Sequence, residues 1–283
     1  MITVRPPPRA LPLNLQLLCV FGSMSSLMGW GIVAFGLIFV RIFAGDITPG
    51  ELTRWGGELE TAPGAITAVE YNTAQENDVY VNRVHFTFTA RDMHLYEGVS
   101  YITTDADVPE GATTVEYPVG EPAHARVKGM RATWFSAGAL FVWIFPGVGM
   151  LFAGYGTATG LKARALLIDG NMAEAEYVGR EATNMRVNNQ LVYRYTFAFE
   201  GPMGRQELTT RSTEAGRLTD EATERVLYDT GRPERAILFD LLPGDPVVLP
   251  NGTFAARSPR KLYPALIAPT LLVLIHGAWT LLT

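Results

Sequence analysis

The chain has 283 residues, of which 48% are hydrophobic and 18% charged, with 23 basic side chains against 28 acidic ones. A mean hydropathy of +0.12 is high for a soluble domain, and it arises from a few long uncharged runs, which are typical of membrane spans. The single cysteine excludes disulfide scaffolds, Cys-rich metal sites and CxxC redox chemistry, and the net charge of −5 disfavours nucleic-acid binding.

The N-terminal region predicts a tail over residues 1–12 and a first transmembrane helix over residues 13–43. No charged residue occurs between Arg9 and Arg41, and the stretch Leu17–Val40 is long enough to cross a bilayer. This stretch is too long for the core of a signal peptide and lacks a small-residue cleavage site. We therefore expect a helix that is retained in the membrane.

The polar segment 46–131 predicts a small β domain. Val84, Phe86 and Phe88 alternate with polar residues, which is the pattern of a half-buried strand. Further β-like runs lie at Ala65–Tyr71, Val99–Thr104 and Thr113–Tyr117. The segment is acidic, with 14 acidic against 6 basic side chains.

A second uncharged run predicts a transmembrane helix over residues 132–161, kinked at the PGVG sequence of Pro146–Gly149. Thirty residues rise about 45 Å as a helix, which is enough for one tilted span and too short for two. The alternative is a re-entrant segment that turns at Pro146 and Gly147 and returns to the same side of the membrane.

Residues 162–261 predict a second β domain, and residues 262–283 predict a third transmembrane helix. Aromatic residues alternate with other residues along Tyr193–Phe199. Further β-like runs lie at Ala173–Val178, Gln206–Arg211, Arg225–Tyr228 and Ala236–Phe239. About five short strands per segment, without a long amphipathic helix, predict a small antiparallel barrel or curled sheet in each domain.

The two β segments resemble each other, which predicts an internal duplication. Val115–Val127 aligns without a gap with Val226–Leu238 at an offset of 111 and shares five identities. Glu-Tyr and Val-Asn pairs also recur at an offset of 106, at residues 70–71 and 81–82 in the first copy. We expect the shared hairpin to be structural, with its glycine at positive φ. Its residues are Tyr117, Gly120 and Pro122 in the first copy and Tyr228, Asp229, Gly231 and Pro233 in the second.

The second copy resembles the bacterial membrane-protein family of the domain of unknown function 3592 (DUF3592). The matching positions are Gly170, Ala173, Tyr193 to Phe197, Tyr228, Asp229, Pro233 and Ala236. Thr230 replaces a proline of the family pattern, and the first copy is more diverged. The resemblance implies a short β domain that follows a transmembrane helix, in a bacterial inner-membrane protein, and it implies no activity.

Small residues in the predicted spans indicate close helix packing. They are Gly22, Ser25, Gly29 and Gly36 in the first span and Gly156 and Gly160 in the second. Such positions let a neighbouring helix approach closely. We favour packing among the spans of one chain over dimerisation, so a homo-oligomer is the alternative.

Charge does not settle the topology. With the N-terminus inside, seven flanking basic residues lie in the cytoplasm and five outside, whereas the re-entrant arrangement gives nine against two. The first β segment carries a net charge of −8 and the second is neutral. We therefore expect the first β domain outside the cytoplasm and the second inside, as part of a multi-pass inner-membrane protein.

Candidate catalytic chemistry is sparse. His85, His94 and His124 lie in the first β segment but lack the spacing of metal ligands, so we expect neither a metal nor a cofactor. His276 lies in the third span, where a hydrogen bond to another helix or a position at the membrane interface is favoured over a proton relay. The nucleophile-elbow, zinc-protease, P-loop and dinucleotide-binding motifs do not occur in their expected contexts. We therefore expect no enzymatic activity.

The sequence as a whole predicts an α+β membrane protein with three transmembrane helices and two duplicated β domains. The expected role is structural or adaptor, with the lipid bilayer and a protein as partners. The alternative is a subunit of a transporter or channel that acts as a homo-oligomer, favoured by Pro146, Pro269 and His276 in the spans. A membrane-anchored enzyme is the third hypothesis.

Overall fold

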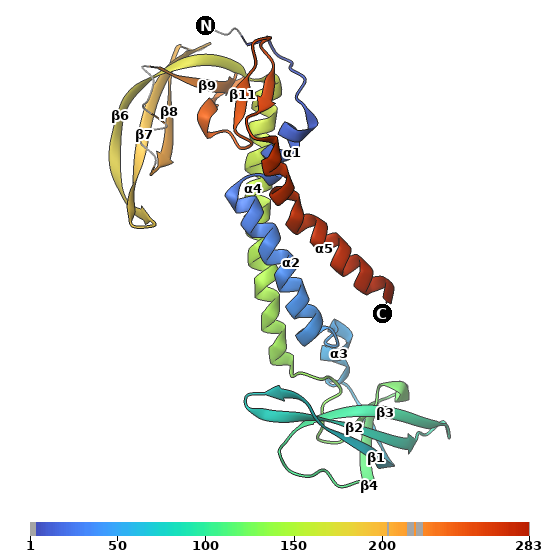
Figure 1. Ribbon diagram of the computed structural model, residues 1–283. Coiled ribbons are helices and arrows are strands. Elements are labelled where there is room, and N and C mark those ends of the chain that lie inside the picture. The colour runs from blue at the N-terminus through green and yellow to red at the C-terminus, as the bar shows by residue number, and fades with distance from the viewer. Residues whose placement is uncertain (1–3, 203, 214–217, 219–222, 283) are drawn as a thin grey trace. The chain divides into compact units, whose positions relative to one another are not determined.

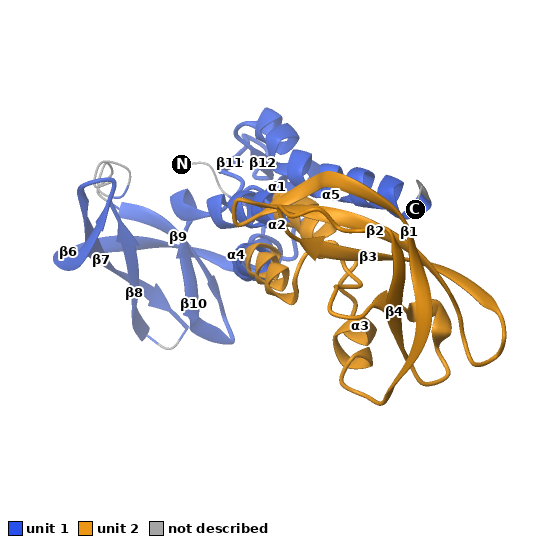
Figure 2. Ribbon diagram, turned by 90° about the horizontal axis from the view of Figure 1, so that it is seen from below, with its two compact units in different colours: residues 1–34, 147–283 blue, residues 35–146 orange. Residues whose placement is uncertain are grey.

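A computed structural model describes residues 4–202, 204–213, 218 and 223–282. The fold is α+β (Figure 1), with two antiparallel five-stranded sheets. Within the described residues, three helices are long and apolar enough to cross a membrane. The chain divides into two compact units, residues 1–34 with 147–283 and residues 35–146 (Figure 2).

The N-terminal apolar run forms two helices, so the single helix predicted over residues 13–43 is wrong. Helix α1 covers Leu13–Phe21 and helix α2 covers Met24–Ala44. The chain breaks at Gly22 and Ser23, where the Ser23 hydroxyl accepts a hydrogen bond of 3.1 Å from the backbone N–H three residues later. Such a bond is typical of the first residue of a helix.

Helix α1 is part of the protein core. Leu15, Leu18 and Cys19 are almost fully buried in one cluster with side chains of the later helices and strands of the same unit. Hydropathy does not separate a helix buried in protein from one buried in lipid, because both are apolar. The membrane-spanning candidate therefore begins at Met24.

The predicted N-terminal tail is also packed. The backbone N–H of Arg5 donates to the Gly252 carbonyl at 3.0 Å, and that of Arg9 donates to the Ile168 carbonyl at 2.9 Å. Leu11 is 8% exposed and joins the same core as α1. Residues 4–12 thus belong to the folded unit.

The second candidate span contains one helix that is not interrupted at the predicted PGVG break. A 3-10 helix, Ala137–Trp143, precedes helix α4, which covers Ile144–Asp169. Pro146 lies in the first turn of α4, where a backbone N–H has no partner within the helix, so proline breaks no hydrogen bond. The re-entrant alternative required a turn at Pro146 and Gly147, and α4 runs through both residues.

Helix α5 covers Leu262–Leu282 and matches the predicted third span. The three candidate helices are of bilayer length, since the 21 residues of α2 and of α5 rise about 32 Å and the 26 residues of α4 about 39 Å. Most apolar side chains of α5 are exposed, among them Tyr263 and Val273.

The first sheet lies within residues 35–146 and has the order β3-β2-β1-β4-β5. The short helix α3, Pro49–Arg54, precedes it. The strands are β1 (Leu59–Glu76), β2 (Val79–Thr89), β3 (Leu95–Thr103), β4 (Gly111–Pro118) and β5 (Arg126–Val127), with a 3-10 turn, Pro122–His124, before β5. The predicted core face is confirmed, since Val84, Phe86 and Phe88 are at most 3% exposed.

The second sheet lies in the other unit and has the order β10-β9-β6-β7-β8. Its strands are β6 (Asn171–Val187), β7 (Gln190–Gly201), β8 (Gly204–Ser212), β9 (Thr223–Asp229) and β10 (Arg232–Leu238). A small third sheet, β11 (Pro246–Val248) with β12 (Phe254–Ala256), and the 3-10 turns Phe239–Leu241 and Pro259–Lys261 complete the unit. Tyr195, Phe197 and Phe199 fill its core as the alternation predicted.

The two five-stranded sheets have the same strand order and register. Ile66 pairs with Phe86 and Tyr177 with Phe197, which is one offset of 111 residues, and a bulge follows each pair. The ring pair Phe88–Tyr117 recurs as Phe199–Tyr228, with centroids 5.3 and 5.2 Å apart. The matches at an offset of 106 are therefore wrong. The Glu-Tyr match lies in the equivalent strands β1 and β6 but is shifted by five residues from their register, and the Val-Asn match pairs β2 with the end of β6 and the turn after it.

Neither sheet closes into the predicted barrel. In the first sheet the edge strand β5 has only two residues, and its Val127 N–H donates to the Ser100 hydroxyl of β3. Beyond β5, a single backbone bridge joins Tyr101 of β3 to Arg131. A ladder needs repeated backbone pairs, so the sheet curls without closing.

The buried position of Cys19 predicts an unreactive thiol. Burial raises the pKa of Cys19 to about 11, because the thiolate loses its water, and its Sγ donates to the Pro243 carbonyl at 3.3 Å. At pH 7.5 the thiol stays protonated, so a membrane-permeant maleimide should leave the folded protein unlabelled. The same reagent should label one site per chain after unfolding in dodecyl sulfate, as mass spectrometry would show. Rapid labelling of the folded protein would place α1 outside the core.

Candidate functional site

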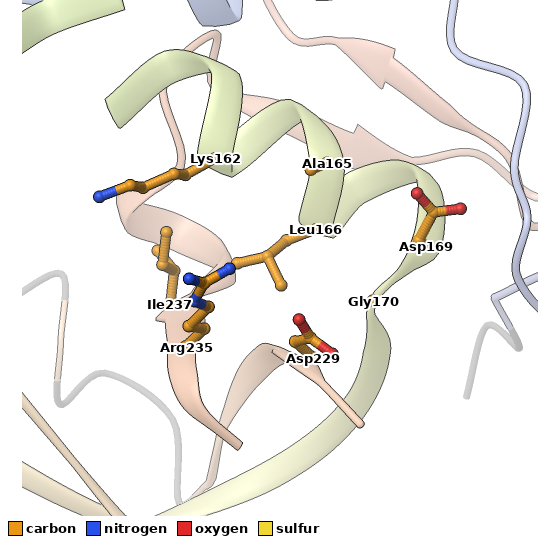
Figure 3. Close-up of a pocket in the computed structure, with 8 residues that line it drawn as sticks. All are labelled: Lys162, Ala165, Leu166, Asp169, Gly170, Asp229, Arg235 and Ile237. Carbon is orange, nitrogen blue, oxygen red and sulfur yellow. The ribbon is translucent and has the colours of Figure 1, made fainter. Parts of the chain in front are cut away.

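A cavity of about 430 Å³ lies where helix α4 meets the β9–β10 hairpin (Figure 3). Its volume is within the range of small-molecule sites. All lining residues belong to one compact unit. The lining includes Lys162, Leu166 and Asp169 from α4 and Asp229, Arg235 and Ile237 from the hairpin.

The cavity combines an apolar wall with charges of both signs. Leu166 and Ile237 form the apolar wall. The charged side chains are Lys162, Arg235, Asp169 and Asp229, and their formal charges sum to zero. Within the described part of the chain, Lys162 and Arg235 make no side-chain hydrogen bond or ion pair. Figure 3 shows Arg235 between Lys162 and Asp229. The cavity thus offers two basic groups and a carboxylate to a polar ligand.

An exposed strip on α4 leads into this cavity. Val148, Leu151 and Tyr155 are 39%, 75% and 66% exposed, and the exposed residues Ala158, Lys162 and Ala165 continue the series. The intervals of three and four residues place all of them on one helix face. Lys162 is the first charged residue after the uncharged run, so the strip changes from apolar to charged at the cavity.

The hairpin residues of the second copy form one side of the cavity. The Gly231 N–H donates to Asp229 Oδ1 at 2.9 Å, which closes the turn. Pro233 is buried and lies where the β9–β10 ladder is interrupted, between Arg232 and Ala236. A proline without an N–H fits such a gap.

The predicted conformation of the turn glycine is confirmed in one copy only. Gly120 has a φ of +78°, whereas Gly231 has no positive φ. The prediction for Gly231 was wrong: two residues connect β9 and β10, and the turn is held by the hydrogen bond to the Asp229 carboxylate without a left-handed glycine. The first copy instead has a longer connection that contains Pro122. Tyr117 is 2% exposed, and burial raises the pKa of its hydroxyl.

This difference predicts unequal costs for two alanine substitutions. Gly120→Ala should destabilise the protein by about 1 to 2 kcal/mol, because a Cβ disfavours left-handed backbone. Gly231→Ala should cost less than about 0.5 kcal/mol, because a Cβ there would meet only Asp229 Oδ1, at 3.5 Å. Thermal unfolding of the purified full-length variants measures both costs. Equal shifts would show that the left-handed turn at Gly120 is not formed.

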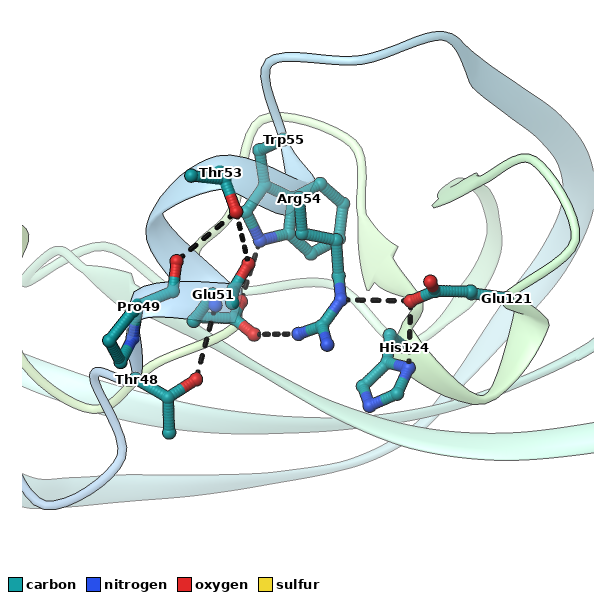
Figure 4. A network of polar contacts seen from close by, with 9 residues as sticks. Thr48, Pro49, Glu51, Thr53, Arg54, Trp55, Glu121 and His124 are labelled. Atoms are coloured by element: carbon teal, nitrogen blue, oxygen red, sulfur yellow. Dashed lines mark hydrogen bonds and ion pairs between the residues drawn. The ribbon is translucent and has the colours of Figure 1, made fainter.

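A polar network ties α3 to the hairpin connection of the first sheet (Figure 4). Glu51 accepts a hydrogen bond of 2.6 Å from Trp55 Nε1 and forms an ion pair with Arg54. Arg54 Nε also donates to Glu121 Oε2 at 3.0 Å. The Arg126 guanidinium lies 3.7 Å from the centre of the Trp55 ring. Each group has a partner within the network, so its role is structural.

The three histidines of the first sheet do not converge. His85 Nε2 lies 2.8 Å from Glu70, His94 contacts Asp92, and His124 contacts Glu121. The hydrogen bond from His85 lowers the pKa of the Glu70 carboxyl. Across the described ranges, no group of three or more His, Cys, Asp or Glu residues is arranged to hold a metal ion.

The small-residue positions lie mainly where helices of the same chain cross. A Cβ on Gly156 would lie 2.9 Å from Ser26 Cα, and one on Gly160 would lie 2.8 Å from the Cys19 carbonyl carbon. A Cβ on Gly29 would overlap the backbone of Ala153, and in the other unit a Cβ on Gly36 would overlap Pro146. Later residues of α2 meet earlier residues of α4, so these two helices pack antiparallel.

The remaining predicted packing residues have other positions. Gly22 ends α1, and Ser25 is only half-buried, since the neighbouring Ser26 faces α4. His276 Nε2 is buried without a hydrogen-bond partner in the described chain. The predicted bond from His276 to another helix is therefore not formed within these residues.

Comparison with protein-family models, with curated proteins and with solved structures finds no match for this chain. The resemblance to the domain of unknown function 3592 stays a prediction from the sequence motifs. The cavity and the two sheets therefore carry the functional argument.

Proposed function

We propose that this chain is an integral membrane adaptor whose two β domains lie on opposite faces of a bacterial inner membrane. Helices α2 and α4 are each of bilayer length and apolar, which supports one crossing by each. A domain between two single crossings lies on the opposite side from the domain that follows them. The charge difference between the β segments supports the first domain outside the cytoplasm.

The shared strand order and register support an origin of both sheets by internal duplication. Strand order, bulges and ring pairs agree at one offset, which two independent folds have no reason to share. Duplication of a binding module places similar surfaces on the two sides of a membrane.

Protein binding is supported by exposed apolar residues on the long β6 strand. Tyr177, Val178, Met185 and Val187 are between 41% and 52% exposed. Contiguous exposed apolar surface marks interaction sites, and we assign these four positions to such a surface. This observation carries the adaptor proposal, while the charged cavity supplies no nucleophile and base in a catalytic arrangement.

Site-specific crosslinking in the native membrane tests the adaptor role. A photoreactive residue at Met185 should give one saturable adduct with a protein partner, whereas the same residue at Glu234, an exposed position on β10, should not. The substitution Val187→Lys should abolish the Met185 adduct by placing a charge in the contact. Adducts of equal yield from both positions would contradict a specific surface on β6.

A transporter or channel subunit is the second candidate, favoured by the exposed apolar surface of α5 and by His276 Nε2, which has no hydrogen-bond partner among the described residues. Three spans do not line a pore alone, so this function requires several copies. Size measurement in detergent separates the candidates, because a tight homo-oligomer supports transport and a monomer supports the adaptor.

A further inference from the structure

We propose that the cavity between α4 and the β9–β10 hairpin binds the zwitterionic headgroup of a phospholipid, with an acyl chain along the exposed strip of α4. The ligand class is a phosphate ester that carries a primary ammonium, as in phosphatidylethanolamine. The proposal rests on membrane insertion of α4, which is part of the proposed function.

The position of the cavity favours a lipid headgroup. Lys162 follows about thirty uncharged residues, so it marks the boundary between hydrocarbon and headgroups if α4 spans the bilayer. Asp169 lies seven residues further, about 10 Å along the helix. The cavity therefore opens at the depth of the lipid phosphates and amines.

The charges of the cavity complement a zwitterion. Lys162 and Arg235 supply donors for a phosphate, and neither is engaged by another side chain in the described residues. The Asp229 carboxylate uses Oδ1 for the turn at Gly231, and among the described residues Oδ2 makes no such bond, so Oδ2 can accept from an ammonium. The two basic and two acidic side chains of the lining cancel in charge, so a headgroup of zero net charge keeps the occupied lining neutral.

The strip on α4 favours an amphiphile over a soluble phosphate. Val148, Leu151 and Tyr155 are exposed on the face that continues into Lys162 and Ala165. An acyl chain that lies along this face places its headgroup at the cavity without a bend. A soluble phosphate ester with a primary ammonium would bind the charged side chains of the cavity but would leave the apolar strip of α4 uncovered.

Native mass spectrometry of the full-length protein in detergent tests this assignment. Phosphatidylethanolamine should bind saturably with one tight site, and phosphatidylglycerol and glycerophosphoethanolamine should bind at least about tenfold more weakly. Glycerophosphoethanolamine binding as tight as the lipid would overturn the lipid assignment. Tighter binding of phosphatidylglycerol would overturn the zwitterionic class.

Substitutions of residues that line the cavity provide a second test of the lipid site. Lys162→Gln and Arg235→Gln should each weaken phosphatidylethanolamine binding about tenfold, whereas Arg232→Gln, an exposed arginine on the same strand and outside the cavity, should leave it unchanged. Asp229→Asn keeps an oxygen for the Gly231 turn and raises the charge of the cavity to +1, so it should shift the preference toward phosphatidylglycerol. Equal binding by the wild type and all four variants would overturn the site.

Two controls separate this proposal from the proposed function. Thermal unfolding shows whether each variant is folded, and all altered side chains are exposed or half-buried, so the variants should fold. Carbonate extraction of membranes tests insertion on its own. A protein that stays in the membrane but binds no phosphatidylethanolamine refutes the lipid site alone, and a protein that is extracted refutes membrane insertion.

Discussion

Replacing Gly29 by leucine should destabilise the α2–α4 pair by more than about 3 kcal/mol, whereas Gly31→Leu should change its stability by less than about 0.5 kcal/mol. A Cβ at Gly29 would overlap the Ala153 backbone nitrogen and lie 2.8 Å from the Gly149 carbonyl oxygen. Nothing lies within 4 Å of a Cβ at Gly31. Because the atoms met at Gly29 are backbone, α4 must move as a whole to admit the side chain.

Thermal unfolding of both variants in one detergent measures this difference, and a second pair on α4 repeats it. Gly156→Leu would meet the Ser26 backbone, while Gly154→Leu points into open space. All four variants should still insert, since leucine is more apolar than glycine. Equal melting shifts at Gly29 and Gly31 would mean that the helices do not cross at this glycine.

Replacing Arg9 by alanine should destabilise the unit that contains α4 by about 2 to 4 kcal/mol. The Arg9 guanidinium is buried and donates to the carbonyls of Leu167 at 3.2 Å and Gly170 at 2.7 Å. It also lies 5.3 Å from the centre of the Phe254 ring. Carbonyls at the end of a helix have no partner within the helix, so Arg9 supplies the bonds that the end of α4 lacks.

The neighbouring Arg5 provides a matched control. Its side chain is exposed and makes one hydrogen bond of 3.2 Å to the Asn251 carbonyl, so Arg5→Ala should cost less than about 0.5 kcal/mol. Arg9→Lys should lie between the two, because lysine keeps the charge without the planar donor set. Chemical unfolding in a fixed detergent gives all three values. Similar costs for Arg5→Ala and Arg9→Ala would refute the capping role.

Hydropathy and alternation predicted much of the fold. The uncharged runs placed the three spanning candidates, and the alternation of Val84, Phe86 and Phe88 placed a strand and its buried face. Both patterns reflect the partition of side chains between water and an apolar phase, which sequence records directly. The offset of 111 between the hairpins also matched the register of the two sheets.

Features that depend on contacts between distant segments were not predictable. Arg9 was assigned to a tail because its partners, Leu167 and Gly170, lie about 160 residues away in the chain. The break between α1 and α2 depends on Gly22 at the end of α1 and on a single Ser23 cap at the start of α2, within an apolar run. Closure of a sheet depends on edge pairing, which alternation does not encode.

The cavity was only partly visible in the sequence. Asp229 and Pro233 stood out because the hairpin recurs in both copies, but they were interpreted as turn residues. Arg235 and Asp169 carry no local signal, since isolated charges on strands and helix ends are common. Only the approach of α4 to the hairpin brings them together.

Cysteine accessibility at two equivalent turns tests the central claim, that α2 and α4 each cross the membrane once and separate two related β domains. Gln75 and Arg186 are both exposed and occupy the same register position of the two sheets, paired with Tyr80 and Leu191. The buried Cys19 should give no background. A membrane-impermeant maleimide added to intact spheroplasts should label Gln75→Cys and spare Arg186→Cys, and inside-out vesicles should give the reverse. Labelling of both positions from the same side would contradict the account.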